Sequence, residues 1–474
     1  MTSAPIKIKE TIADPRLQQA IYTATGRLMS HRAQAIQPAL MPEYQELRTR
    51  AHEIKRHTIE NLDYYLELLE SKVTAHGGKV IFCRDAAEVA DFVLGLAKER
   101  GAKLIVKSKS MTTEEIGLNE RVERHQLEAV ETDLGEYILQ LAHQRPYHIV
   151  APALHMTRYE VADIFTEKLG VKNEVVIENQ TKIARSVLRE KFLAADIGIT
   201  GANFLVADSG AVLVVENEGN ARLSSSAPKI HIAIAGIEKL IPRAQDLPLF
   251  LKLLGRSATG QAMTVYTSFL SGPRRSDEID GPDEFYVVLL DNGRTKLLAN
   301  ADKRESLYCI RCGACLNHCP VYRKIGGHSY PWIYSGPIGK IITPQFHGVM
   351  QDPWLPFASS LCGACAEVCP VKIDIPKLLL QLRSEVVEAK TRGGTAGEER
   401  RGFRLFAWLM QRPKLFQFAG RMAARFGPRP AGGKWISKVP GLFNIEPVRN
   451  WLSQRDLPPP APKSFHQLWK ERKK

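Results

Sequence analysis

The chain has 474 residues, 44% of them hydrophobic and 24% charged, a balance typical of a globular protein of about three domains. This composition excludes a mainly disordered chain, and no run of ~18 uncharged apolar residues indicates a membrane-spanning helix. The first ten residues, MTSAPIKIKE, lack the apolar stretch of a secretory signal. We therefore expect a cytoplasmic protein.

The net charge of +14 is concentrated at one end of the chain. Residues 400–474 hold 17 Lys or Arg and 3 Asp or Glu, so residues 1–399 are neutral overall. A basic segment of this kind suits an acidic partner, anionic lipid or nucleic acid, or is a solvated tail.

Helical patterns come first in the chain. Apolar residues recur with helical spacing within 15–75, and Gly77 and Gly78 end the pattern. From residue 79 strands and helices alternate, which predicts an α/β domain with a largely parallel sheet. The expected strands include 79–83, 103–110 and 147–155, the expected helices include 85–101, 157–169 and 178–195, and 128–144 continues the alternation.

A second kind of pattern follows. Residues 195–242 contain short apolar runs separated by Gly, Asp and Asn, which predict closely packed strands with turns at 208–210 and 216–220. Residues 284–298 are predicted to form a hairpin, because Asn292–Gly293 is a favoured two-residue turn. No GxGxxG follows a strand here, so we predict no Rossmann dinucleotide site. We expect an N-terminal helical region at 1–78 and an α/β domain at 79–300.

Seven of the eight cysteines lie between residues 309 and 369. Their clustering at short spacings indicates metal binding rather than disulfides. The first motif is the full run of bacterial ferredoxins, in which two residues separate each of three successive cysteines and three residues separate the third from a fourth, which precedes proline. The second motif has three cysteines and again ends in Cys-Pro. The seven are Cys309, Cys312, Cys315 and Cys319 in the first motif, and Cys362, Cys365 and Cys369 in the second.

Two iron–sulfur clusters are therefore predicted. Zinc is the competing interpretation, but a zinc site ordinarily uses two CxxC pairs, which this pattern is not. In such ferredoxin runs the last cysteine ligates the other cluster. Cluster 1 is then assigned Cys309, Cys312, Cys315 and Cys369, and cluster 2 is assigned Cys319, Cys362 and Cys365.

Cluster 2 is one thiolate short, because Ser359 occupies the position where a fourth cysteine would stand. Three interpretations stay open. The cluster is [4Fe–4S] with a hydroxyl, water or other side chain on its fourth iron; it is [3Fe–4S]; or Cys83 reaches it from the α/β domain, although a thiol at the end of a strand is usually buried and inert.

The remaining regions suggest contact surfaces. Residues 301–390 are predicted to be an α-helical ferredoxin-type domain that ends in a helix at 376–390. Between the two motifs, Trp332, Tyr334 and Trp354 are candidates to shield the clusters from water. In the basic region 391–474, apolar residues lie among arginines at 400–426. We expect this stretch to pack on a partner subunit; a peripheral membrane contact is the alternative, which Pro413 weakens by breaking the helix. No nucleic-acid-binding motif accompanies the charge.

These motifs carry a family resemblance. The stretches CIRCGACLNHCPVYRKIGGHSY, YSGPIGKIITP and LCGACAEVCPVKIDIP resemble lactate utilisation protein B, and KWISKVPGLFNIEPVRNWL resembles the C-terminal region of that family. The block DIGITGANFLVADSGAVLVVENEGN resembles the LUD domain. Similarity extends over nearly all of the chain after about residue 50, and the family also has three cysteines in its second motif.

The resemblance implies an iron–sulfur subunit of a three-protein system, with lactate utilisation proteins A and C, that oxidises L-lactate to pyruvate. It implies for 79–300 a fold like that of CoA transferases and sugar-phosphate isomerases. We expect an electron-transfer component rather than a complete enzyme, and predict no catalytic residue.

Alternatives stay open beside this interpretation. The chain could instead be the iron–sulfur subunit of a glycolate- or glycerol-3-phosphate-type oxidase, or an acyl- or CoA-transferring enzyme with a redox-sensing cluster domain. In the last case Glu216 or Glu218 would be the nucleophile, whereas a turn carboxylate that holds backbone amides is the simpler expectation. Lys107, Ser108 and Lys109 could bind an anion such as lactate, but we expect a solvated strand exit.

Overall fold

The computed structural model describes residues 4–394, 397–426, 435–439, 441, 448–449, 452 and 456–472. Residues up to Val386 form one compact unit and those from Val387 onward form a second, and each is described by itself. The divisions at residues 78 and 300 fall inside the first unit and stay predictions. Among the described residues, no helix is long and apolar enough to cross a bilayer.

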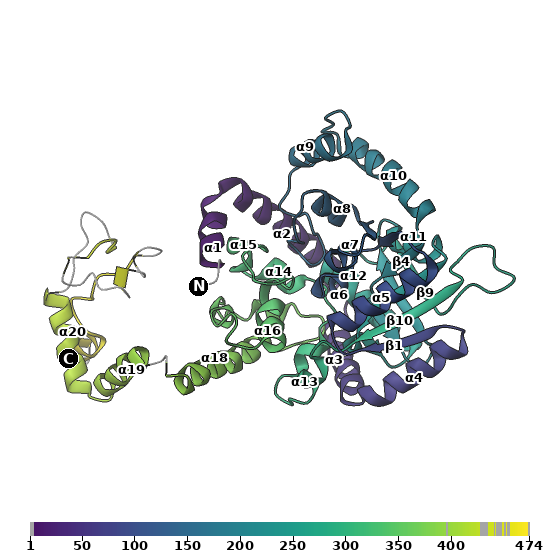
Figure 1. Cartoon of the computed structure of the whole chain (residues 1–474). Coiled ribbons are helices and arrows are strands. Elements are labelled where there is room, and N and C mark those ends of the chain that lie inside the picture. The colour runs from purple at the N-terminus through teal and green to yellow at the C-terminus, as the bar shows by residue number, and fades with distance from the viewer. Residues whose placement is uncertain are drawn as a thin grey trace. The chain divides into compact units, whose positions relative to one another are not determined.

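A six-stranded parallel sheet is the centre of the first unit (Figure 1). Its strands lie in the order β1-β10-β7-β4-β2-β3, with bounds β1 Lys79–Cys83, β2 Leu104–Lys107, β3 Glu128–Glu131, β4 Ile197–Thr200, β7 Ile230–Gly236 and β10 Glu284–Leu290. A second sheet has the order β8-β5-β6-β9, with bounds β5 Phe204–Val206, β6 Ala211–Glu216, β8 Leu240–Ile241 and β9 Tyr266–Leu270.

Helices precede, connect and follow these strands. The first four are α1 Ala4–Ala13, α2 Pro15–Ala35, α3 Tyr44–Glu60 and α4 Leu62–Ala75. Those between strands are α5 Ala86–Arg100, α6 Met111–Glu115, α7 Leu118–Glu123, α8 Leu134–Leu141, α9 Arg158–Leu169, α10 Ile177–Ala194, α11 Asn220–Ser226 and α12 Leu247–Ala258. The cysteine region contains α13 Arg294–Leu298, α14 Ala314–His318, α15 Tyr322–Ile325, α16 Gly336–His347, α17 Ala364–Glu367 and α18 Ile375–Arg392.

The sheet is buried on both faces, as expected for parallel strands. Alternate residues of β10 point to opposite sides: Tyr286 and Val288 pack with α5 and α7, whereas Phe285 and Val287 belong to the core that continues into the second sheet and the cysteine region. At the β2 and β3 end, the second face is covered instead by α8, α9 and α10. Helices on both faces make the sheet doubly wound, with a topological switch point between β2 and β4.

Two sequence predictions in this domain are wrong. Residues 284–298 are no hairpin: β10 inserts in parallel between β1 and β7, and Asn292–Gly293 instead leads into α13. Residues 147–155 form no strand, because the segment folds back on itself through a hydrogen bond from Tyr147 N to Pro152 O. The strand block 195–242 is also interrupted by α11. Local signals failed here because pairing in a sheet depends on strands that are distant in the sequence.

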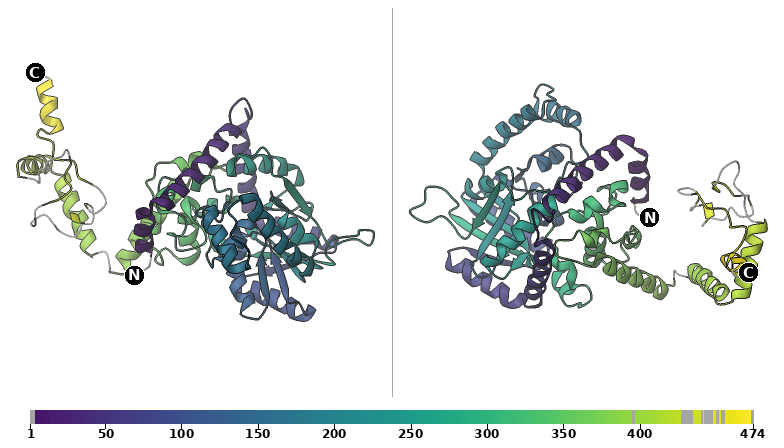
Figure 2. Two further views of the ribbon diagram at one scale, coloured as in Figure 1. Left: turned by 90° about the horizontal axis from the view of Figure 1, so that it is seen from above. Right: turned by 180° about the vertical axis from the view of Figure 1, so that it is seen from behind.

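The N-terminal helices pack on the cysteine region rather than standing apart. Helix α2 contacts α14 and α15, and α1 contacts α15 (Figures 1 and 2). Helix α3 contacts η3 (Arg304–Tyr308), the single turn that precedes the first cysteine. The cysteine region is therefore packed against helices that are far from it in the sequence.

In the second unit, two amphipathic helices follow one another. α19 (Gly397–Met410) ends shortly before Pro413, which begins α20 (Pro413–Phe426), so proline separates them as predicted. Both helices leave large apolar side chains exposed, among them Phe403, Leu405, Phe406, Trp408, Phe416 and Phe418. The final described helix is α22 (Phe465–Arg472).

A candidate two-centre cysteine site

The two cysteine motifs adopt the same local backbone. In each, a Cys-Gly-Ala-Cys sequence places its glycine, Gly313 or Gly363, in the left-handed conformation at φ +76° or +83°. The residue before that sequence, Arg311 or Leu361, also has positive φ, at 60° and 53°. Each glycine then starts a single helical turn, α14 or α17. Glycine is suited to this repeated conformation because it adopts positive φ without steric cost.

Cysteines from both motifs line one apolar cavity. Its lining includes Cys309, Cys312 and Cys315 from the first motif and Cys369 from the second. The rest of its wall is mainly aliphatic, with Ile149, Ile310, Ile338, Val371, Ile373 and Ile375. The structure thus brings together the four residues assigned to cluster 1, although Cys312 and Cys369 are 57 positions apart in the numbering.

The spacing of the sulfur atoms bears on which centre fits. A tetrahedral zinc site with Zn–S bonds of ~2.3 Å holds its sulfurs about 3.8 Å apart. Among the described residues, no three cysteines place their Sγ atoms within 4.8 Å of one another. Four thiols from two motifs around one apolar cavity are a donor set that fits a [4Fe–4S] cluster. Burial, together with the negative charge of neighbouring thiolates, raises the pKa of Cys312 and Cys315, as expected for thiols that only a metal would deprotonate.

Backbone amides also point at the sulfurs. The N–H groups of Arg311, Tyr322 and Ile373 donate to Cys309, Cys319 and Cys369 respectively, each at an N···S distance of 3.4 Å. Hydrogen bonds of this kind stabilise anionic sulfur and are one of the factors that set a cluster's reduction potential. Three of the predicted ligands are thus already held in a conformation suited to a thiolate.

The remaining three cysteines form a second, more open group. Cys319 is buried, Cys365 is half-buried and Cys362 is exposed. The ammonium group of Lys340, fully buried in α16, donates to Cys319 Sγ at 3.7 Å. The pKa of Cys365 is raised to about 11, mainly by burial and then by the charges of Cys319 and Cys362. These interactions place the three thiols predicted for cluster 2 in one neighbourhood.

The two candidates for a fourth ligand differ in position. Ser359 is half-buried, its hydroxyl accepts from Leu361 N at 3.2 Å and its carbonyl accepts from Arg383. Cys83 lies at the end of β1 inside the core formed with α5 and α7, a core that includes none of the other cysteines. Burial raises the pKa of Cys83 to about 11. Its setting is that of a structural thiol.

Charged side chains that the sequence did not single out surround the first motif. Arg311, between two predicted ligands, forms an ion pair with Glu238 at 3.4 Å and lies over the ring of Tyr334. Glu238 and Glu115 both pair with the fully buried Arg294, from α13. Tyr334 donates to Glu115 at 2.6 Å. This buried network joins the carboxyl edge of the sheet to the first cysteine loop, so Tyr334 has a polar role beyond the shielding predicted for it.

Arginines of the N-terminal helices hold the second motif. Arg48 in α3 donates from Nε to Cys369 O at 2.9 Å and from Nη2 to Ala366 O at 3.2 Å. Arg32 in α2 donates to Val368 O at 3.4 Å. Arg32 and Arg48 are buried, and their targets are backbone carbonyls, so no sequence motif marks them.

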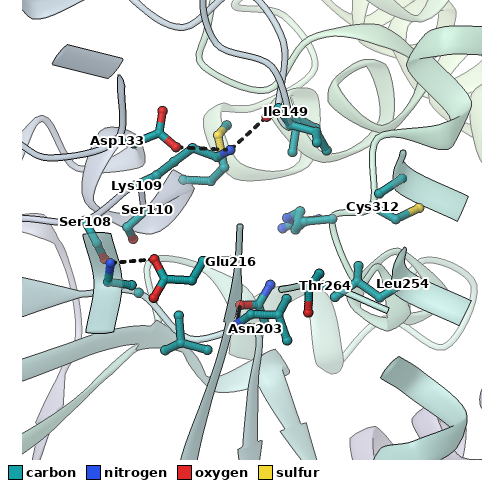
Figure 3. A pocket seen from close by; sticks show the side chains of 18 of the residues that line it. Ser108, Lys109, Ser110, Asp133, Ile149, Asn203, Glu216, Leu254, Thr264 and Cys312 are labelled. Atoms are coloured by element: carbon teal, nitrogen blue, oxygen red, sulfur yellow. Dashed lines mark hydrogen bonds and ion pairs between the residues drawn. The ribbon is translucent and has the colours of Figure 1, made fainter. Parts of the chain in front are cut away.

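A larger cavity of about 260 Å³ lies beside the first cysteine loop, at the carboxyl ends of β2, β3 and β4. Figure 3 shows Ser108, Lys109 and Asp133 on one side and Cys312 on the other, with the Cys312 sulfur turned away from the cavity. Glu216 and Glu218 also line it. Lys107 does not: it is fully buried and paired with Glu114 and Glu131 at 2.9 and 2.6 Å. The prediction of a solvated strand exit at 107–109 is therefore wrong.

The carboxylates of this cavity are anchored from the backbone. Glu216 accepts from Ala221 N at 2.7 Å and from Arg222 N at 2.8 Å. Glu218 accepts from Leu134 N at 3.1 Å. Partial burial, followed by the negative charge of Asp133, raises the pKa of Glu218 to about 7. These bonds agree with the expectation of turn carboxylates that hold backbone amides.

Three segments of the chain match known protein families. Residues 66–290 match the LUD domain, residues 305–373 match a 4Fe-4S dicluster domain, and residues 381–474 match the family described as lactate utilisation protein B, C-terminal. Proteins named lactate utilization protein B from Bacillus thuringiensis and Bacillus anthracis are each 43% identical over 99% of this chain and 97% of their own lengths.

One solved structure also aligns with part of the chain. It is of a duf162 family protein from Deinococcus radiodurans, which covers 48% of this chain and 98% of its own length. Its sequence identity is 11% and the TM-score is 0.27, at which the alignment carries no argument about function.

Proposed function

The chain belongs to the lactate utilisation protein B family, and we propose that it conducts electrons from L-lactate, through two iron–sulfur clusters, while a multi-protein system oxidises lactate to pyruvate. Each cluster, when bound, supplies one-electron transfer. The observation that carries the proposal is the apolar cavity lined by Cys309, Cys312, Cys315 and Cys369. Thiols from two distant motifs meet there in the pairing that two-cluster ferredoxin motifs use.

We assign those four cysteines to cluster 1, of the [4Fe–4S] type. Cys319, Cys362 and Cys365 are assigned to cluster 2. Its greater exposure at Cys362, and the position of Cys83 in another core, support a fourth iron without a cysteine ligand, or a [3Fe–4S] centre. Electron paramagnetic resonance of the oxidised protein separates the two, because a [3Fe–4S]⁺ centre gives a signal and a diamagnetic [4Fe–4S]²⁺ centre does not.

We further propose that lactate utilisation proteins A and C are the partners of this chain. The exposed apolar side chains of α19 and α20 are suited to a protein interface because they leave much apolar surface in water. Isolation of the tagged protein without oxygen, followed by identification of what is bound to it, tests this. Salt-sensitive flotation with anionic liposomes, without co-purified partners, would indicate a peripheral membrane contact instead.

The decisive experiment combines metal analysis with growth. Anaerobically purified protein is expected to contain about seven or eight irons and about eight acid-labile sulfides per chain, as two clusters require. A deletion strain is expected to lose growth on L-lactate and to keep it on glycolate and glycerol. Protein that holds only zinc, or a strain that fails on glycolate but grows on lactate, would overturn the proposal.

The acyl- or CoA-transfer alternative is tested at the anchored carboxylates. Both Glu216 oxygens accept backbone N–H groups, which weakens a carboxylate as a nucleophile. Under our proposal, Glu216 and Glu218 form no covalent acyl intermediate. Mass spectrometry of the protein incubated with acyl-CoA thioesters should therefore show no acyl adduct, and an adduct abolished by Glu216→Gln would favour transfer.

A further inference from the structure

The 260 Å³ cavity lies where the central sheet reverses its winding direction. Its lining contains Ser108, Lys109 and Ser110 after β2, and Gly201, Ala202 and Asn203 after β4. The gap between these two strands is the switch point of the sheet, which is where ligands bind in open α/β folds. The volume is below the ~300–1,000 Å³ of pockets for drug-sized molecules, which points to a small ligand.

Two donor groups on the wall of this cavity, Lys239 Nζ and Arg311 Nη1, lack a hydrogen-bond acceptor among the described residues. Lys239, in η1 (Ile237–Lys239), is only 9% exposed, and its ammonium has no hydrogen-bond acceptor in the part of the chain that the structure describes, while the charges of Glu238 and Cys309 act on it from nearby. Arg311 Nη1 is likewise buried without an acceptor there. Burial of a polar group without a hydrogen bond is costly, and more so when the group is charged. The cavity is therefore built to receive negative charge on the side that Lys239 and Arg311 line.

The other lining charges limit what that anion is. Lys109 is committed to Val150 O at 2.8 Å and lies 4.0 Å from Asp133. Asp133, Glu216 and Glu218 add negative charge along the rest of the wall. A ligand with two separated anionic groups would meet these carboxylates, whereas a monoanion whose other end carries a hydroxyl or carbonyl would not be repelled.

The cavity also adjoins the cysteine cage. Ile149, Ile310, Arg311 and Cys312 line both the 260 Å³ cavity and the cavity of the four cysteines. Because the sulfur of Cys312 faces away from the larger cavity (Figure 3), one loop separates a bound ligand from cluster 1. Arg311 could interact with a ligand in the larger cavity or with the cysteines of cluster 1, because the charge of Cys309 also acts on its guanidinium group. Lys239 lines only the larger cavity.

We propose that this cavity binds a short-chain 2-hydroxy or 2-oxo monocarboxylate, with its carboxylate on Lys239 and Arg311. The identity of the acid rests on the proposed function, but the binding of a carboxylate does not. The chain would thus hold the substrate or product acid itself, beside the cysteines assigned to cluster 1.

Binding to the anaerobic holoprotein is measured by isothermal titration calorimetry with L-lactate, pyruvate, propionate and malonate. L-lactate and pyruvate should bind at least tenfold more tightly than propionate, which lacks the oxygen on C2, and than the dianion malonate. Lys239→Met should weaken the binding of lactate and pyruvate at least tenfold, while Lys239→Arg retains most of it. Lys191→Met, which removes a lysine outside this cavity that pairs with Glu128, is the matched control and should leave binding unchanged.

Stability and redox measurements distinguish a ligand-binding role of Lys239 from a purely structural role. Lys239→Met should keep the wild-type iron content and the wild-type urea midpoint or a higher one, because it removes an unpaired buried charge. Unchanged acid binding with a shift only in the cluster reduction potential would overturn the inference, because Lys239 would then serve the cluster alone. Equal affinity for propionate would overturn the preference for an oxygen on C2. If pyruvate binds as expected but lactate does not reduce the clusters with the partners present, the inference stands and the proposed function fails.

Discussion

Arg294→Met offers a direct test of the charge network that joins the sheet to the first cysteine loop. Arg294 is fully buried and contacts two carboxylates from different parts of the chain. It donates to Glu115 from Nη1 at 2.9 Å and from Nη2 at 2.8 Å, and it pairs with Glu238 through Nε. Methionine fills similar space without charge, so the substitution removes the cation and leaves both carboxylates in place.

The expected cost follows from what remains after the substitution. Glu115 still accepts from Tyr334 and Asn292, and Glu238 still faces Arg311 at 3.4 Å. Neither carboxylate can reach bulk water, because both side chains are at most 1% exposed. Removing one partner from a buried ion pair typically costs ~3–5 kcal/mol. We expect a loss of this size in the free energy of unfolding.

Urea unfolding of the anaerobic holoprotein measures the loss. The control is Arg274→Met, which breaks an arginine–carboxylate pair of similar length: Arg274 lies 2.7 Å from Asp283, but the two side chains are 42% and 46% exposed. Because solvent screens such pairs, we expect a cost under about 1 kcal/mol. The double variant Glu115→Gln/Arg294→Met should lose less than the sum of its single variants, since the two side chains interact directly.

Equal losses for Arg294→Met and Arg274→Met would refute the reasoning, because burial would then have no effect on the energy of the pair. Strict additivity of the double variant would refute it separately. In that case Glu115 and Arg294 would act independently, and the contact distances would have no energetic meaning.

Three further predictions concern other parts of the molecule. Arg48→Met leaves Cys369 O and Ala366 O without their charged donor. Iron content should therefore fall, and the free energy of unfolding measured in urea should drop by about 2–4 kcal/mol. Wild-type values for both quantities would contradict the view that Arg48 holds the second motif in place. Lys340→Met removes the cation beside Cys319, which should lower the reduction potential of one centre and leave the other unchanged in an anaerobic redox titration. Burial lowers the pKa of His231 from 6.5 to about 3. Its folded-state pKa lies below its unfolded value, so its contribution to stability is present above pH 6.5 and is lost as pH falls toward 3. His231→Gln should reduce the loss of stability between pH 7 and 5 by about 2 kcal/mol. If the free energy of unfolding of the variant and of the wild type fell equally over this pH range, His231 would not be a neutral buried histidine.

Much of the local structure followed from the sequence. The sequence predicts a helix at 85–101, and in the structure Asp85 accepts from Ala87 N and Glu88 N at one end while Gly101 is left-handed at the other. Both signals act within a few residues, so they need no tertiary context. The strand and turn signals around Asn292 failed for the opposite reason: β10 pairs with strands far away in the sequence.

The sequence by itself determined the chemistry of this protein, because seven cysteines at ferredoxin spacings specify a sulfur-liganded centre wherever they lie. Only the tertiary structure decided what surrounds them. The cations Arg48, Lys239, Arg294 and Lys340 come from helices and loops distributed over the whole first unit, and no motif distinguishes them from solvated surface charges. Their significance comes from burial and from the partners they have or lack, and both depend on long-range packing rather than on neighbours along the chain.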